Sequence, residues 1–181
     1  SEIILKTFED TRMLELCTPV IFANVKIMSF AKKNLDATIA LHGIDKIDQL
    51  LPGKINVLNV WKEGVVVEYG VNDENVGKYA IKSFTAATKA LKDGQIDVLV
   101  TAPINKYNIQ SEEFKFPGHT DYLNQELEGD ALMLMVQDDL RVGLITDHVP
   151  VNEVASHLTE ALIKSKIETI KKSLIQDFSI S

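Results

Sequence analysis

The hydrophobic pattern of the chain alternates between short apolar runs and longer stretches in which apolar residues recur every three or four positions. Short runs of β-branched or alternating apolar residues are typical of strands. They occur at residues 19–23, 37–41, 54–60, 65–69, 96–100, 132–136 and 140–145. Glu63-Gly64 separates the run at 54–60 from the run at 65–69, which predicts a hairpin, and Asp138-Asp139 joins the last two runs.

Helical segments are predicted between these strands. Residues 2–8 have a helical pattern, and Asn24 is a good N-cap for a second helix that runs to Asn34. Asn72 is expected to cap the longest helix of the first half, and Gly94 to end it. The apolar positions of that helix are Val76, Ala80, Phe84, Ala87 and Leu91. A final amphipathic helix carries Ile163, Ile167, Ile170, Leu174 and Phe178.

Alternation of strands and helices predicts an α/β layered architecture with a largely parallel sheet. Ligands of such folds usually bind in the loops at the carboxyl ends of the strands. Three loops carry most of the candidate chemistry: residues 101–106, 116–121 and 146–150. We therefore expect the functional residues in these loops.

Composition narrows the functional classes. The 181 residues are 45% hydrophobic and 25% charged, as in globular proteins, and no apolar run approaches the roughly 20 residues that cross a bilayer. The formal net charge is −7, and no run of basic residues is present, so we expect neither a nucleic acid nor a membrane as partner. The single Cys17 cannot form an internal disulfide, and we interpret it as a packing residue in a cytoplasmic protein.

The loop at 116–121 has the features of an anion site. Pro117 and Gly118 predict a tight turn, after which Thr120 is expected to cap a helix and leave His119 at its positive end. A phosphate or carboxylate there would accept hydrogen bonds from Thr120, His119 and main-chain N–H groups, and Lys106 would add a positive charge. The alternative is a capped helix with an exposed His119 and a solvated Lys106.

A second candidate is His148, which follows the last predicted strand and can hold a metal ion or a substrate. A catalytic divalent ion needs about three protein ligands. His42, expected in a turn, and His157, in a polar helical stretch, are interpreted as surface residues. Any further ligands would therefore come from outside this segment. Asp147 is either a partner of the His148 ring or an ordinary residue at a strand end.

Several common signatures are missing from the sequence. It contains neither G-x-G-x-x-G nor G-x-x-x-x-G-K-[ST], so the usual dinucleotide and nucleoside-triphosphate loops are not indicated. It also contains neither G-x-S-x-G nor H-E-x-x-H.

The three loops together resemble a known family. Residues 100–106 (VTAPINK), 117–123 (PGHTDYL) and 140–150 (LRVGLITDHVP) are similar, in order and spacing, to successive signatures of 4-hydroxythreonine-4-phosphate dehydrogenases. These are NAD-dependent enzymes of pyridoxal phosphate biosynthesis. The resemblance extends from Glu2 to the last helix. Departures from the family pattern are small. Ala102 stands where Gly is usual, and Asp121 where Glu is usual. Residues 147–150 are Asp-His-Val-Pro, where the family commonly has Thr-His-Leu-Pro.

The resemblance implies roles for individual residues. His119 and Thr120 would bind the phosphorylated substrate, and His148 would be the first of three histidine ligands to a divalent metal, Zn, Mg or Co. We assign His148 and Lys106 as catalytic residues. Residues that bind NAD are not assigned, because most cofactor contacts of the family lie in its second half.

The resemblance also implies an architecture. The fold would be a three-layer αβα arrangement like that of isocitrate and isopropylmalate dehydrogenases, here incomplete. Residues 1–181 would form a single α/β segment, the N-terminal half of a larger dehydrogenase, truncated at both ends. The active site would be shared between two subunits of a homodimer.

The implied reaction is the metal- and NAD-dependent oxidation of 4-phosphooxy-threonine, followed by decarboxylation to an aminoketone phosphate. Alternatives are a phosphate acyltransferase of similar fold, a non-catalytic phosphate-binding module, and a dehydrogenase of another phosphorylated hydroxy acid or of a dihydrodiol. We expect residues 1–181 alone to be inactive and to hold no divalent ion tightly.

Overall fold

The computed structural model describes residues 1–111 and 114–180. They form two compact units, Ser1–Tyr122 and Leu123–Ser181. None of the helices in the described residues combines the length and the apolar character that crossing a bilayer requires.

A three-stranded parallel sheet is the centre of the first unit. Its order is β1 (Val20–Ala23), β3 (Ile55–Asn59) and β2 (Leu41–Ile44), so β3 has a neighbour on both edges. Val20 pairs with Asn56 across one ladder, and Leu41 with Ile55 across the other. The predicted strands at 19–23 and 54–60 are confirmed.

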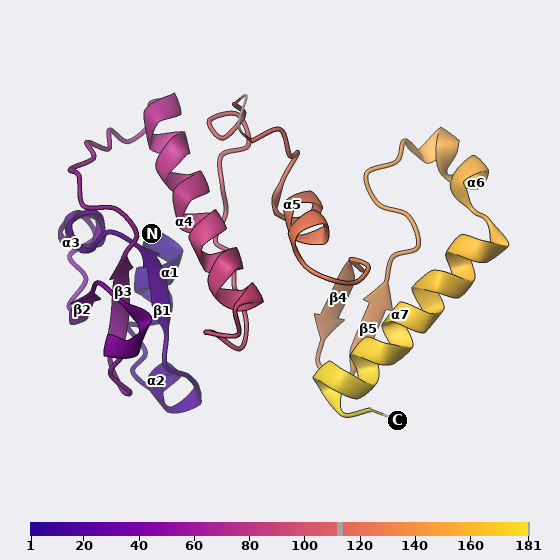
Figure 1. Ribbon diagram of the computed structural model, residues 1–181, viewed down its shortest axis with the longest axis horizontal. Coiled ribbons are helices and arrows are strands. Elements are labelled where there is room, and N and C mark those ends of the chain that lie inside the picture. The colour runs from indigo at the N-terminus through magenta and orange to yellow at the C-terminus, as the bar shows by residue number, and fades with distance from the viewer. Residues whose placement is uncertain (112–113, 181) are drawn as a thin grey trace. The chain divides into compact units, whose positions relative to one another are not determined.

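Helices cover both faces of this sheet. Ile21 of β1 packs in one apolar cluster with Leu5 of α1 (Glu2–Thr7) and Met28 of α3 (Val25–Asn34). Its neighbour Phe22 points the other way and packs against Ala87 and Ala90 of α4 (Glu74–Lys92). Figure 1 shows the strands with α3 on one side and α4 on the other. The predicted α/β architecture with a parallel sheet is confirmed, and this unit has three layers.

Polar side chains cap the N-termini of α3 and α4. Asn24 caps α3 as predicted, because its Oδ1 accepts the Lys26 N–H at 2.8 Å. The predicted cap of α4 is wrong by one residue: Asp73, not Asn72, accepts the Asn75 N–H at 2.8 Å. The side chain of Asn72 is bound elsewhere, to Asn105.

Three predicted strands of the first unit are wrong or displaced. Residues 65–69 form no strand, and hence no hairpin, because both edges of β3 are already paired with β1 and β2. Residues 96–100 form no strand either: Ile96 and Leu99, three residues apart, pack near Phe22, while Val98 and Val100 are 70% and 86% exposed. The strand predicted at 37–41 begins only at the last residue of that range.

The remaining elements of the first unit are short. α2 (Met13–Leu16) precedes β1 in the chain, and a 3₁₀ turn, η1 (Ile47–Gln49), lies between β2 and β3. Cys17 follows α2 and is exposed, so the prediction that it packs in the interior is wrong. Its thiol sulfur donates only a long contact of 3.5 Å to the Met13 carbonyl oxygen.

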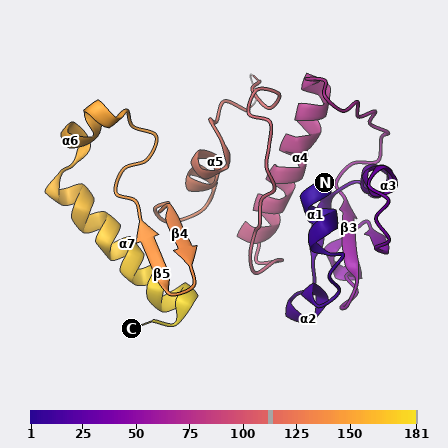
Figure 2. The ribbon, with the colours of Figure 1, turned by 180° about the vertical axis from the view of Figure 1, so that it is seen from behind.

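The second unit is built on a hairpin and a long helix. β4 (Leu134–Gln137) and β5 (Leu140–Gly143) are joined by Asp138-Asp139, as predicted, and their pairing is antiparallel. The predicted final helix is confirmed as α7 (Glu160–Phe178). It lies along the hairpin (Figure 2). Ile170 packs against Gly143, and the Arg141 guanidinium is 4.5 Å from the centre of the Phe178 ring. Two short turns, η2 (Val151–Glu153) and α6 (Val154–His157), precede α7.

Candidate functional site

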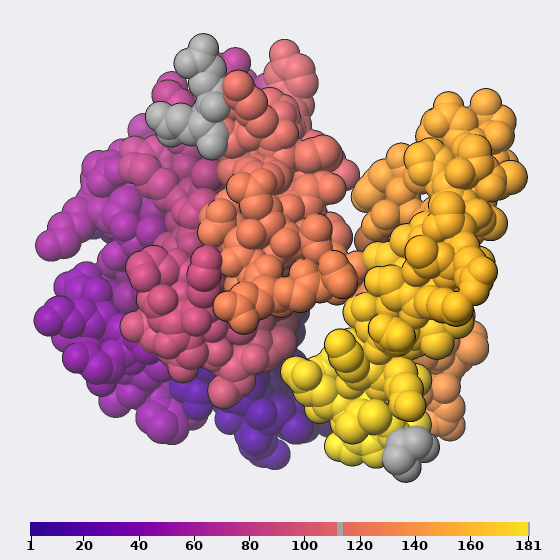
Figure 3. Space-filling view, turned by 45° about the vertical axis from the view of Figure 1, so that its right-hand side comes forward, coloured from indigo at the N-terminus to yellow at the C-terminus, as the bar shows by residue number. Residues whose placement is uncertain are grey.

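The loop that carries Lys106 lies directly on α4. A Cβ atom on Gly77 of α4 would be 1.9 Å from the carbonyl oxygen of Asn108, so only glycine allows this approach. The next residue, Ile109, is 1% exposed and anchors the loop in the apolar interior. In the space-filling view, the salmon and orange atoms of this part of the chain lie against the magenta and pink atoms that precede them in sequence (Figure 3).

Asn105 fixes the turn that begins at Lys106. Its Oδ1 accepts the N–H groups of Tyr107 at 3.0 Å and of Asn108 at 3.2 Å, which closes an Asx-type turn. Its Nδ2 donates to Oδ1 of Asn72 at 3.1 Å. The turn is thereby connected to the residue that precedes the cap of α4.

Lys106 extends from this turn towards α5 (His119–Glu126). A Cβ atom on the buried Gly118 would lie 3.5 Å from Lys106 Cε and 3.7 Å from its Nζ. The ammonium group therefore passes close to the main chain just before α5. His119 is the first residue of that helix. The structure thus brings together Lys106 and His119, which the sequence places in different loops.

Aromatic packing holds His119 against α4. Its ring contacts Phe84 edge-on, with 4.7 Å between the ring centres, and Tyr122 contacts the same Phe84 at 5.0 Å. Phe114 and Phe116 complete the group, at 5.4 Å and 5.2 Å from Tyr122. His119 is therefore half-buried and not exposed as the alternative had it, whereas Lys106 is exposed, in agreement with that alternative.

The electrostatics of this site favour an anion. Burial lowers the pKa of His119 below its ordinary 6.5, and the nearby charge of Lys106 lowers it further. Because folding lowers the pKa of this base, the folded chain binds fewer protons than the unfolded chain in the interval just below pH 6.5. The stability of the unit decreases as the pH falls through that interval. A phosphate at this position would meet the positive end of α5 and the Lys106 ammonium.

Thr120 lies at the second position of α5 and is half-buried. The prediction that it caps the helix is wrong, because the helix already begins at His119. Its place beside His119 still puts Thr120 in the first turn of α5, and the first turn of a helix is where main-chain N–H groups can bind an anion.

His148 lies in the second unit, in the loop between β5 and η2. β5 ends at Gly143, so His148 does not follow the strand directly, as the sequence pattern predicted. It is exposed and has a φ of 54°, a left-handed conformation that is uncommon outside glycine. Asp147 beside it is exposed as well.

The other two histidines lie on other elements of the two units. His42 lies in β2, opposite Asn56, and not in a turn as predicted. His157 ends α6 and is exposed, as predicted. Within the described residues, no group of three His, Cys, Asp or Glu side chains is placed to hold a metal ion.

Sequence reasoning missed the contacts that shape this site, namely Gly77 against Asn108 and Asn72 with Asn105. One of them left a signal, because a glycine inside an otherwise regular helix often marks a close approach of another backbone. The pairing of two distant asparagines left none.

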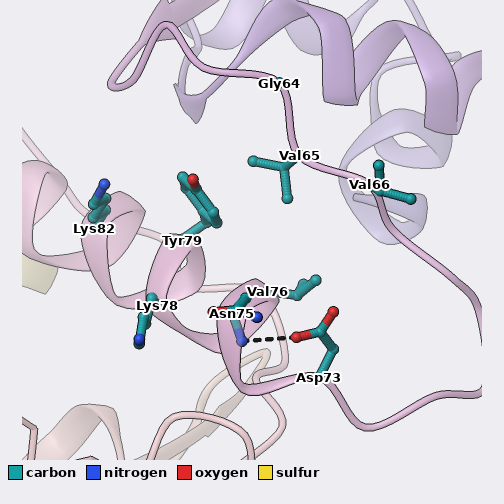
Figure 4. Close-up of a pocket in the computed structure, with 9 residues that line it drawn as sticks. All are labelled: Gly64, Val65, Val66, Asp73, Asn75, Val76, Lys78, Tyr79 and Lys82. Carbon is teal, nitrogen blue, oxygen red and sulfur yellow. Dashed lines mark hydrogen bonds between the residues drawn. The ribbon is translucent and has the colours of Figure 1, made fainter.

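A cavity of about 360 Å3 opens elsewhere on the first unit, between the segment at Gly64 and the first turns of α4 (Figure 4). Its lining residues are Gly64, Val65, Val66, Asp73, Asn75, Val76, Lys78, Tyr79 and Lys82. None of the residues assigned from the sequence lines it.

Comparison with known proteins gives a consistent result. The family model described as pyridoxal phosphate biosynthetic protein PdxA matches residues 15–181. The chain is 41% identical over 181 residues to a 4-hydroxythreonine-4-phosphate dehydrogenase of Bacteroides thetaiotaomicron, covering 99% of this chain and 50% of that protein. It is 31% identical over 183 residues to the enzyme of the same name from a Sulfurihydrogenibium species, covering 100% and 56%.

A solved structure supports the fold. The crystal structure of a 4-hydroxythreonine-4-phosphate dehydrogenase from Burkholderia phymatum superposes with a TM-score of 0.85 at 22% sequence identity, over 96% of this chain and 54% of that one. The chain therefore spans about half the length of the curated relatives it matches.

The close contact between Asn108 and Gly77 of α4 leads to a stability prediction. Gly77→Ala should lower the free energy of unfolding by about 1–3 kcal/mol, the usual cost of overpacking, although alanine is the better helix former. Urea denaturation measures the change. Gly64→Ala is the matched control, since nothing lies within 4 Å of a Cβ there. An unchanged or higher stability of Gly77→Ala would show that Asn108 does not approach the helix so closely.

The anion site leads to a titration prediction. Without ligand, the ring of His119 should titrate below 6.5, and inorganic phosphate should raise its pKa, because a bound anion stabilises the imidazolium. NMR titration of the His119 ring protons, with and without phosphate, measures both values. The exposed His157 serves as the internal control, and its signal should not respond to phosphate. A His119 pKa that saturating phosphate leaves unmoved would contradict the site.

Proposed function

Because the chain belongs to the PdxA family of pyridoxal phosphate biosynthetic proteins, we propose that it is part of an NAD-dependent dehydrogenase acting on 4-phosphooxy-threonine. The observation that carries this proposal is the convergence of Lys106 and His119 at the start of α5. The product would be an aminoketone phosphate, formed by oxidation of the secondary hydroxyl and loss of carbon dioxide.

In this proposal the first unit binds the phosphate end of the substrate. His119 donates a hydrogen bond from its ring, Thr120 offers its hydroxyl, and the main-chain N–H groups at the start of α5 point towards the anion. Lys106 supplies a full positive charge from the neighbouring turn. The contact of His119 with Phe84 fixes the ring, so little side-chain entropy is lost when the phosphate binds.

His148 is the residue of this chain that would bind a divalent metal, Zn, Mg or Co. Its exposed imidazole fits as one ligand, but no described residues complete a set of three around it. We propose that the other two ligands come from outside residues 1–181. When bound, such an ion would lower the pKa of the substrate hydroxyl, and NAD would accept the hydride. The role of this chain is to bind and orient the phosphate group of the substrate.

The wider architecture belongs to the same proposal. We propose a fold related to isocitrate and isopropylmalate dehydrogenases, with residues 1–181 as one α/β segment of a larger dehydrogenase. The active site would be shared between the subunits of a homodimer. A cytoplasmic location agrees with the exposed thiol of Cys17, since an unpaired exposed cysteine is best kept in a reducing compartment.

The phosphate assignment of His119 predicts a selective loss of activity. The test uses a full-length enzyme of the family that includes this chain. In it, His119→Ala should lower kcat/KM for the phosphorylated substrate roughly 10- to 150-fold, since a charge-assisted hydrogen bond contributes about 1.5–3 kcal/mol. The unphosphorylated analogue should be affected much less. Steady-state kinetics with both substrates measures the difference, with His157→Ala as control. Equal losses for the two substrates would overturn the assignment.

The metal assignment predicts weak binding by the isolated chain. Residues 1–181 should not hold zinc tightly at micromolar concentration and should form no NADH, since His148 supplies only one of about three ligands. Calorimetric titration with zinc and an absorbance assay for NADH test both statements. Tight stoichiometric binding that His148→Ala leaves untouched would show that His148 is not a ligand. Turnover by the isolated chain would place the chemistry elsewhere.

A further inference from the structure

We propose that Asn105 is a positioning residue for Lys106: its link to Asn72 and its turn-closing hydrogen bonds hold the lysine beside the start of α5. This inference deepens the proposed function, because it takes the phosphate site at His119 as given. It assigns to Asn105 a role that acts through Lys106 and does not require Asn105 to touch the substrate.

The loop needs such a connection on the side that precedes Lys106. On the side that follows, Asn108 lies on Gly77 and Ile109 is almost fully buried, so the chain is fixed there by packing. On the preceding side, Thr101 and Pro103 are exposed and Ala102 and Ile104 are only half-buried. Within the described residues, no main-chain hydrogen bond ties residues 101–104 to another element. The side chain of Asn105 is thus the connection that anchors this end of the turn.

The side chain of Asn105 is already used within the protein. Its oxygen accepts two main-chain N–H groups, those of Tyr107 and Asn108, and its amide nitrogen donates to Asn72. An anion ligand would have to replace the contact with Asn72 or use the one remaining amide hydrogen. A role through the neighbouring Lys106 agrees better with this geometry than direct contact with a substrate.

The position of Lys106 matters because lysine is a point charge on a flexible stem. Its Nζ is placed near Gly118, within reach of an anion at the start of α5. If the turn loses the three hydrogen bonds of the Asn105 side chain, the main chain at Lys106 is no longer fixed. The Lys106 ammonium group then samples a larger volume and is less often beside α5. The site then keeps its helix terminus and His119 but loses the localised positive charge of Lys106.

The inference is tested by a double-mutant cycle on the chain of 181 residues, with Asn105→Ala, Lys106→Ala and the double variant. The first readout is the titration of His119 by NMR without ligand, since the charge of Lys106 lowers the pKa of that ring. We expect Lys106→Ala to raise this pKa. Asn105→Ala should move it in the same direction, and the double variant should match Lys106→Ala alone.

The second readout is the affinity for inorganic phosphate, measured by calorimetry. Lys106→Ala should weaken binding about tenfold or more, as expected for a charge-assisted hydrogen bond. Asn105→Ala should produce a large part of that loss, and the double variant should add nothing. Asn72→Ala, which removes only the link between the loop and the residue before α4, should act in the same direction and guards against misfolding of Asn105→Ala. Tyr107→Phe, in the same turn but with an exposed side chain, is the matched control and should change neither readout.

The possible outcomes separate this inference from the proposed function. Failure of the parent chain to bind phosphate would overturn the phosphate site, while the titration of His119 would still report where Lys106 lies. If Lys106→Ala raises the pKa of His119 and neither asparagine variant does, positioning by Asn105 is overturned. Additive losses of phosphate affinity would also overturn it, because they would mean that Asn105 contacts the anion itself. Non-additive losses together with a raised pKa support it.

Discussion

The contact between the carbonyl oxygen of Asn108 and the bare backbone of α4 at Gly77 is the constraint on which the candidate site depends. Because Gly77 has no side chain, the loop lies closer to the helix than any other residue there would allow. Lys106 therefore begins at a fixed distance from α4, and the same helix supplies Phe84, against which His119 packs. One helix thus sets the separation of the Lys106 ammonium and the His119 ring, whichever anion they bind.

Much of the fold could be predicted from the sequence because its signals are local. The cap at Asn24, the hairpin turn at Asp138-Asp139 and the periodicity of α4 and α7 depend on residues within one or two turns of each other. The strands predicted at 65–69 and 96–100 failed because a strand exists only with a partner, and β3 already had two. Sequence patterns record the apolar character of a segment, but not whether an edge remains free for it.

In the candidate site too, the features with local sequence signals could be predicted and the long-range contacts could not. The rule that ligands gather in loops after strands drew attention to Lys106, His119 and His148, and the structure places the first two together in one unit. The link between Asn72 and Asn105 joins residues 33 positions apart and has no signature in either segment. Contacts of this kind follow from the packing of the loop on α4, which the sequence does not display.

The parallel pairing of the sheet has a consequence for the folding kinetics of the chain. Parallel neighbours cannot be joined by a tight turn, so each ladder of β3 requires a long crossover to close first, and the entropy of loop closure is lost before any pairing is gained. Until that happens, β3 presents two unpaired edges together with the apolar Ile55 and Val57. An unfinished chain in this state is a template for association with its own copies, and the docking of β1 and β2 removes that hazard by pairing both edges.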